Sequence, residues 1–163
     1  MNAVDVARTL VENAPDALLV SSLGTATSAL RRASNDGPHL YFGGAMGCTA
    51  ATALGIADAL PERDVIALVG DGELLMGAST LWSISALAPS NLLLVTLLDG
   101  HYSITGGSQS PQRRGSSKWH RACVISPRLV RAQPMSWLRS CQRFLVRGCS
   151  RRTSKSCARR LGS

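Results

Sequence analysis

Short, uniformly apolar runs alternate with longer helical stretches over the first two thirds of the chain. Apolar residues recur at amphipathic spacing over residues 2–13, and residues 45–60 are small and apolar nearly all round, as in a buried helix. The short runs are typical of strands that are covered on both faces. The pattern predicts helices over residues 2–13, 25–34, 45–60 and 73–88, and strands over residues 16–22, 39–42, 64–69 and 91–98. Because strands and helices alternate with short connections, we expect an α/β fold with a mainly parallel sheet flanked by helices.

The alternation stops near residue 108, and the composition changes at the same point. Residues 1–107 contain 4 Lys and Arg residues and all 10 acidic residues, whereas residues 108–163 contain 14 basic residues and no acidic one. We therefore expect an α/β domain over 1–107, followed by a basic tail rich in Arg, Ser and Cys over 108–163. Such a tail is typical of a disordered or out-of-frame C-terminus. The alternative is an arm that binds RNA or an anionic surface, with a basic amphipathic helix over residues 135–147.

The composition also narrows the class of protein. Cys48 is the only cysteine before the tail, and the tail cysteines lack the spacing of zinc ligands, so we expect reduced thiols and no zinc. No apolar run has the length of a membrane span, and residues 1–11 do not form a signal peptide. We expect a cytoplasmic protein whose α/β domain has neither a membrane nor a nucleic acid as its partner.

One short motif carries the candidate chemistry. Gly70-Asp71-Gly72 lies between a predicted strand and a predicted helix. The glycines allow close approach of the backbone, the helix N-terminus favours an anion, and the carboxylate is a hard ligand for Mg²⁺ or Ca²⁺. Asp99 follows the next strand, and the carboxyl ends of parallel strands lie at one edge of a sheet. The sequence therefore predicts a shared cation and phosphate site, although Gly-Asp-Gly alone also occurs in solvated surface turns.

The spacing of these residues resembles a known family. Gly-Asp-Gly, then 26 residues, then Asp-Gly-His-Tyr at 99–102 is similar to the diphosphate–Mg²⁺ fingerprint of thiamine diphosphate enzymes. The segments GGAMG (43–47) and SSLGTAT (21–27) resemble that family's glycine loop and first strand-end loop. Residues 70–107 most resemble the pyrophosphate-binding domain, or β-subunit, of sulfopyruvate and phosphonopyruvate decarboxylases. The resemblance covers about residues 1–107 and implies thiamine diphosphate and Mg²⁺ as cofactors. A domain of this type normally continues in α/β pattern past residue 107, so the resemblance also implies that the domain here is incomplete.

The resemblance also implies a role for each matching residue. The side chains of Asp71 and Asp99 and the backbone carbonyl of His101 would bind Mg²⁺. The residues expected to contact thiamine diphosphate are Gly24, Thr25, Gly44, Ala45, Met46, Gly70, Asp71, Gly72, Glu73, Leu74, Asp99, His101 and Tyr102. Met46 would be the apolar wedge under the bent cofactor, although it also fits a core position, and Thr25 also fits a helix N-cap.

Two residues depart from the family pattern. Asp99 replaces the usual Asn, and Glu73 stands where Ser or Ala is common. Both add negative charge beside a diphosphate, so we expect weaker cofactor binding. Trp82, on the helix that follows, is expected in the core.

The resemblance leaves the catalytic machinery incomplete. In the family, the activating glutamate lies on a separate pyrimidine-binding domain, and this chain contains no match to that domain. We therefore expect no catalytic residue here, an α-type pyrimidine-binding partner subunit, and decarboxylation of a small 2-oxo acid by the complex. The alternatives are a non-catalytic remnant of such a domain and a basic-tailed binder of nucleic acid or anionic surfaces.

Overall fold

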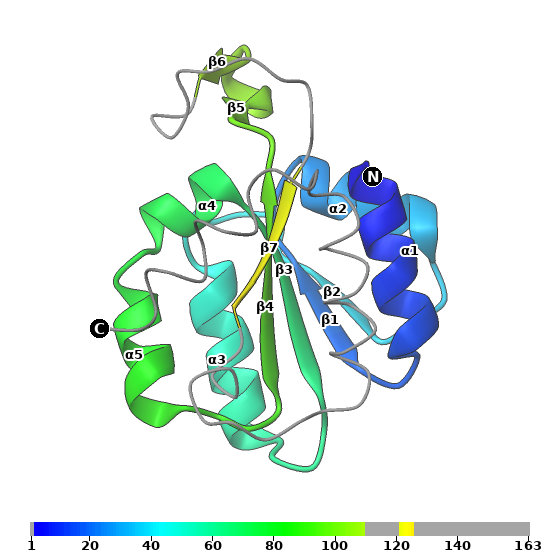
Figure 1. Cartoon of the computed structure of the whole chain (residues 1–163), viewed down its shortest axis with the longest axis vertical. Coiled ribbons are helices and arrows are strands. Elements are labelled where there is room, and N and C mark those ends of the chain that lie inside the picture. The colour runs from blue at the N-terminus through cyan, green and yellow to red at the C-terminus, as the bar shows by residue number, and fades with distance from the viewer. Residues whose placement is uncertain (1, 110–120, 126–163) are drawn as a thin grey trace, which may run out of the picture. The chain divides into compact units, whose positions relative to one another are not determined.

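The computed structural model describes residues 2–109 and 121–125, all within one compact unit, Met1–Ala132 (Figure 1). The irregular tail predicted over 108–163 lies largely outside the described residues, and the helix predicted over 135–147 lies wholly outside them. The helices are α1 (Ala3–Asn13), α2 (Thr25–Ala33), α3 (Thr49–Ala59), α4 (Asp71–Met76), α5 (Thr80–Leu87) and the 3₁₀ turn η1 (Ser103–Thr105). The strands are β1 (Leu18–Ser21), β2 (His39–Tyr41), β3 (Val65–Gly70), β4 (Leu92–Leu98), β5 (His101–Tyr102), β6 (Ser108–Gln109) and β7 (Arg121–Ile125).

The main sheet confirms the predicted α/β class. Its strand order is β2-β1-β3-β4-β7, and the first four strands are parallel, with Val20 opposite Ala67 and Ala67 opposite Leu94. Helices connect these strands, as parallel pairing requires. Because β1, β3 and β4 run in the same direction, their carboxyl ends form one edge, from which the β5–β6 hairpin projects (Figure 1).

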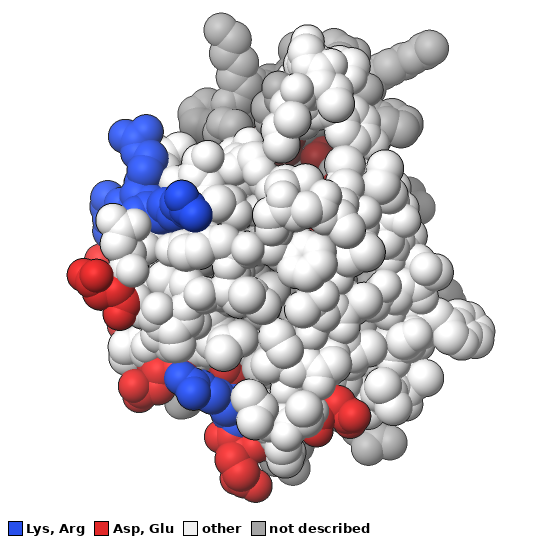
Figure 2. Space-filling model, turned by 180° about the vertical axis from the view of Figure 1, so that it is seen from behind, with Lys and Arg blue, Asp and Glu red and all other residues white. Residues whose placement is uncertain are grey.

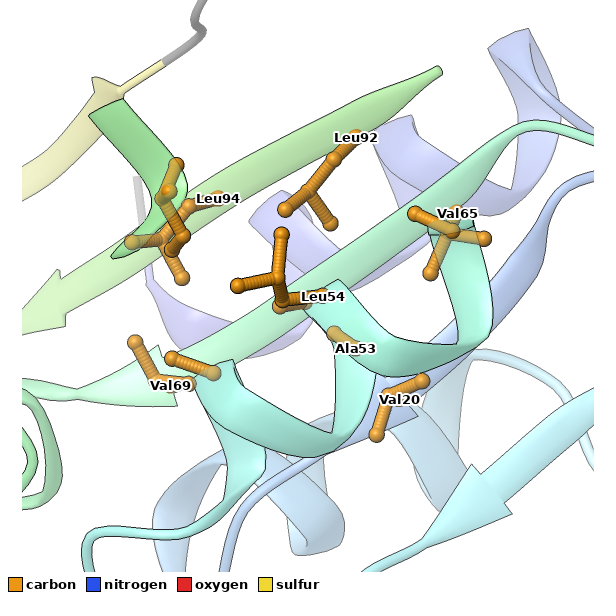
Figure 3. Packing of buried hydrophobic residues seen from close by; sticks show 11 residues of the cluster. Val20, Ala53, Leu54, Val65, Val69, Leu92 and Leu94 are labelled. Carbon is orange, nitrogen blue, oxygen red and sulfur yellow. The ribbon is translucent and has the colours of Figure 1, made fainter. Parts of the chain in front are cut away.

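Helix α3 packs across one face of this sheet. Its Ala53 and Leu54 point toward apolar side chains of β1, β3 and β4, as Figure 3 shows. The strand residues labelled there are Val20, Val65, Val69, Leu92 and Leu94. Alternate positions on the same strands, such as Leu19 and Ile66, are also buried, so both faces of the sheet are covered. Uniformly apolar strands follow from this double burial.

The predicted helix over 73–88 is divided into α4 and α5, which corrects the sequence expectation. The interruption begins at Gly77, where a Cβ atom would overlap the carbonyl oxygen of Gly47, so the two backbones are in direct contact. Helix α5 then buries Ile84 on its inner side. Trp82 lies two positions away, on the opposite side of the helix, and is 84% exposed, so its expected place in the core was wrong.

Strand β7 is a second difference. Residues 121–125 pair antiparallel with β4, with Thr96 opposite residue 123, although the sequence pattern places them in the irregular segment. The strand protects the edge of β4, which would otherwise present unpaired backbone groups. Within the described part of the chain, no helix has the length and apolar character to cross a bilayer.

Candidate cofactor site

A hollow of about 80 Å³ lies at the carboxyl edge of β1, β3 and β4. Ten of the thirteen predicted contact residues line it: Gly24, Thr25, Met46, Gly70, Asp71, Gly72, Glu73, Asp99, His101 and Tyr102. Figure 2 shows acidic atoms recessed in a hollow of the face that it displays. No Lys or Arg is among the described residues that line the hollow. The fold therefore brings the predicted residues together in a strongly acidic setting.

Asp71 connects the ends of two neighbouring strands. It follows β3 directly, and only 4% of its surface is exposed. One carboxylate oxygen accepts a hydrogen bond from the backbone N–H of Gly72 at 2.8 Å, and the other accepts from the N–H of Gly100 at 3.0 Å. Gly100 follows β4, so the carboxylate bridges the two strand ends. Each oxygen has a second lone pair and can still coordinate a cation.

Asp99 makes a similar connection between elements. Its Oδ2 accepts from the hydroxyl of Thr25 at 3.3 Å, and its Oδ1 accepts from the N–H of His101 at 3.0 Å. Thr25 is the first residue of α2, so Asp99 links the end of β4 to the start of that helix. The N–H of Gly100, adjacent to Asp99, binds Asp71, which places the two aspartates beside each other as predicted.

The start of α2 contributes polar backbone groups to the hollow. Its N-cap, Gly24, has φ +69° and carries no capping side chain, and both Thr25 and Ala26 line the hollow. The first N–H groups of a helix lack intrahelical acceptors and carry its partial positive charge. This end of α2 can therefore donate to an anion bound in the hollow.

Gly72 and Tyr102 are matched in shape. A Cβ atom at Gly72 would overlap the ring of Tyr102, so the glycine allows the ring to lie against the start of α4. The same close approach explains why a glycine follows Asp71.

Glu73 lines the hollow, and its carboxylate is bonded to backbone N–H groups of another segment. Its Oε2 accepts from the N–H of Gly47 at 2.7 Å and its Oε1 accepts from the N–H of Thr49 at 3.1 Å, and the residue is 6% exposed. The carboxylate is thus bonded to the loop before α3 and to the first residue of that helix. Its charge is partly offset by the first N–H groups of that helix.

Three predicted contacts are not among the residues that line the hollow. Gly44 and Ala45 are exposed, and Leu74 packs against the core cluster. The lining residues that the sequence analysis missed are Ser22, Leu23, Ala26, Leu97, Ile104 and Thr105. Ser22 is buried, and its hydroxyl accepts from the N–H of Gly70 at 3.3 Å. A polar residue at the end of an apolar strand is the signal that could have found it.

The donor set can be tested for a divalent cation. Among the described residues, no group of three or more His, Cys, Asp or Glu side chains is arranged to hold a metal ion. The hollow instead offers two aspartate carboxylates, together with backbone groups. Mg²⁺ prefers hard oxygen ligands and is commonly bound through one or two carboxylates plus substrate phosphates. The residues present therefore fit Mg²⁺ that is held jointly with a diphosphate.

Comparison with known proteins identifies the family. Residues 22–133 match the model described as thiamine pyrophosphate enzyme, C-terminal TPP binding domain. The chain belongs to this family. The match confirms the resemblance seen in the sequence and ends at residue 133, beyond the predicted domain boundary at 107.

Several curated proteins are similar to this TPP-binding domain. The phosphonopyruvate decarboxylase of Streptomyces viridochromogenes is 37% identical over 103 residues, which are 63% of this chain and 26% of that protein. The sulfopyruvate decarboxylase of Methanosarcina acetivorans is 33% identical over 65% of this chain and 27% of that protein. The sulfopyruvate decarboxylase subunit beta of Methanothermobacter thermautotrophicus is 37% identical over 58% of this chain and 50% of that subunit. The chain thus spans between a quarter and a half of these relatives.

Solved structures share the fold of this TPP-binding domain. A 2-oxoglutarate:ferredoxin oxidoreductase from Magnetococcus marinus superposes with a TM-score of 0.56 at 21% identity, covering 74% of this chain and 40% of that chain. A protein from Mycobacterium smegmatis described as a putative thiamin diphosphate-dependent enzyme gives the same TM-score at 24% identity, covering 70% of this chain and 24% of that chain. These matches confirm a parallel sheet flanked by helices.

Proposed function

We propose that this chain binds thiamine diphosphate, through its diphosphate and Mg²⁺, as one subunit of a 2-oxo acid decarboxylase. The observation that carries the proposal is the pair of aspartates: Asp71 follows β3, Asp99 follows β4, and the N–H of Gly100 connects them. Family membership supplies the cofactor class, and the hollow supplies the ligands that a magnesium diphosphate requires.

Different residues of the hollow would bind different parts of the cofactor. Asp71 and Asp99 would hold the cation, with the backbone carbonyl of His101 as a further oxygen donor. The first turn of α2, with Thr25, would donate to the diphosphate. Met46, which lines the hollow, would support the remainder of the cofactor as an apolar contact. When bound, thiamine diphosphate supplies a nucleophilic carbon and an electron sink for loss of CO₂.

We propose an α-type pyrimidine-binding subunit as the partner. Relatives of this chain include proteins named sulfopyruvate decarboxylase subunit beta, and a subunit of that name implies an α counterpart. The residues of the hollow would bind the cofactor and the cation. None of them is proposed to protonate the aminopyrimidine ring. The complex would decarboxylate a small 2-oxo acid, and the chain alone would be inactive.

Calorimetry of the full chain tests the binding step. Thiamine diphosphate is titrated with Mg²⁺ and with chelator, in the presence and absence of a candidate α subunit. We expect binding only with Mg²⁺, and no binding of thiamine, which lacks the diphosphate. An absence of heat in every arm would favour the alternative that the chain is a non-catalytic remnant. Release of CO₂ from 2-oxo acids by the mixed subunits then tests the reaction.

A further inference from the structure

The carboxylate of Glu73 connects two segments that are distant in the sequence. Glu73 lies in α4, directly after the Gly-Asp-Gly turn, and its two oxygens accept the N–H groups of Gly47 and Thr49. Hydrogen bonds to a charged acceptor are stronger than neutral ones. The 2.7 Å bond to Gly47 is within the range of such bonds. Glu73 thus fixes the position of the loop over residues 43–48 relative to the Gly70-Asp71-Gly72 turn.

Helix α3 lacks a cap of its own at this point. Its N-cap is Cys48, whose side chain makes no capping hydrogen bond, and its first turn contains no acidic residue. A capping side chain normally comes from the residue that begins the helix. Glu73 supplies the missing acceptor from another helix, and its negative charge lies at the positive end of α3.

A second contact holds the loop over residues 43–48 against the end of α4. The backbones of Gly47 and Gly77 touch, and Gly47 adopts φ +91°, which favours glycine. Met46 immediately precedes Gly47 and lines the hollow together with Glu73. The position of Met46 therefore depends on a loop end that is held by a carboxylate and by a backbone contact.

We propose that Glu73 is a positioning residue: it holds Met46 at the hollow and thereby sets the affinity for the thiamine part of the cofactor. The inference rests on the proposed function, because it assigns Met46 to that part. The magnesium diphosphate would be bound by Asp71, Asp99 and the start of α2. None of the hydrogen bonds of these groups described above involves Glu73. Removing the carboxylate should therefore affect one part of the ligand and spare the other.

The test uses the full chain with Glu73→Ala and Glu73→Gln, and with Glu62→Ala as the control. Glu62 is exposed, so its replacement removes the same charge without removing a buried contact. NMR measures amide exchange at Gly47 and Thr49, and calorimetry measures affinity for Mg²⁺ with thiamine diphosphate and for Mg²⁺ with inorganic diphosphate. The amide-exchange measurement requires no cofactor.

In Glu73→Ala we expect exchange at both amides to accelerate about tenfold or more, because both lose their acceptor. Affinity for thiamine diphosphate should fall about tenfold, as is usual for residues that orient a binding group, while affinity for inorganic diphosphate stays within about twofold. Glu73→Gln keeps one acceptor oxygen and should accelerate exchange at only one of the two amides.

Two results would overturn the inference: unchanged exchange at both amides, or equal loss of affinity for the two ligands in a folded variant. If the unmodified chain binds neither ligand, with or without a candidate α subunit, the proposed function fails. The exchange rates at Gly47 and Thr49 then decide alone whether Glu73 holds the loop.

Discussion

Replacing Asp71 by Asn tests the centre of the proposed site. The two side chains have nearly the same shape, but Asn is uncharged and has one acceptor oxygen instead of two. Asp71 accepts two backbone N–H groups, from Gly72 and Gly100, and is 4% exposed. One of these donors would face the NH₂ group of the variant, and a buried unpaired donor costs about 1–3 kcal/mol. Loss of repulsion from Asp99 opposes this effect, so we expect a decrease in unfolding free energy of about 1 kcal/mol.

The effect on ligand binding should be larger and of different origin. A ligand present at about 100 times its dissociation constant stabilises a protein by about 2.7 kcal/mol. For a chain of this size that corresponds to an increase in Tm of about 5–10 °C. Under the proposed function, Asp71→Asn removes a charged ligand of the cation, so the variant should gain almost none of this stabilisation.

Thermal unfolding followed by circular dichroism, with Mg²⁺ alone and with Mg²⁺ and thiamine diphosphate, measures both effects. Asp58→Asn is the matched control, because Asp58 is exposed on α3. If Asp71→Asn gains as much Tm from the cofactor as the unmodified chain does, the carboxylate holds no cation and the reasoning is refuted.

Three further changes test other parts of the structure. Gly72→Ala places a Cβ against the ring of Tyr102 and should lower the unfolding free energy in urea by about 1–3 kcal/mol, most of which Tyr102→Ala in the same chain should restore. Leu54→Ala, at a core position that is 7% exposed, should lower it by about 2–5 kcal/mol, whereas Leu60→Ala, 44% exposed, should change it by less than about 0.5 kcal/mol. Burial lowers the pKa of His39 below its usual 6.5, so the unfolded chain takes up the proton first and stability is lost as the pH falls below 6.5. In urea titrations across this range, His39→Leu should show a smaller loss, and an equal loss would contradict the assignment.

The sequence predicts those parts of the fold that depend on burial along a single segment. β3 and β4 are buried on both faces, and for this reason their sequences are uniformly apolar. The division of α4 from α5 could not be predicted in this way, because the apolar pattern continues through it. The interruption coincides with a close contact between Gly47 and Gly77, which are far apart in the chain. β7 was missed because it lies in an Arg-rich segment and pairs with a distant strand.

The same distinction applies to the site. Asp71 and Asp99 were predictable because each follows a strand, and parallel topology brings strand ends to one edge. The partners of Glu73 are backbone N–H groups, which any sequence supplies, so no residue type indicates them. Gly44 belongs to the motif that resembles the family's glycine loop, but it is exposed and does not line the hollow.

The three acidic residues of the hollow are distinguished by the donors that each accepts. Both carboxylate oxygens of Glu73 accept backbone N–H groups, from Gly47 and from Thr49 at the start of α3, so its negative charge is stabilised by the protein itself. Asp71 and Asp99 accept donors from the ends of the strands and the start of α2, and no Lys or Arg from the described part of the chain lines the hollow beside them. Two neighbouring carboxylates without a basic counterpart favour a divalent cation, because its charge offsets both. The extra negative charge of Asp99, in place of the family's usual Asn, should therefore strengthen the hold on the metal while weakening the direct attraction for diphosphate. Cofactor binding at this site then depends more strongly on the cation than it would with an amide at position 99.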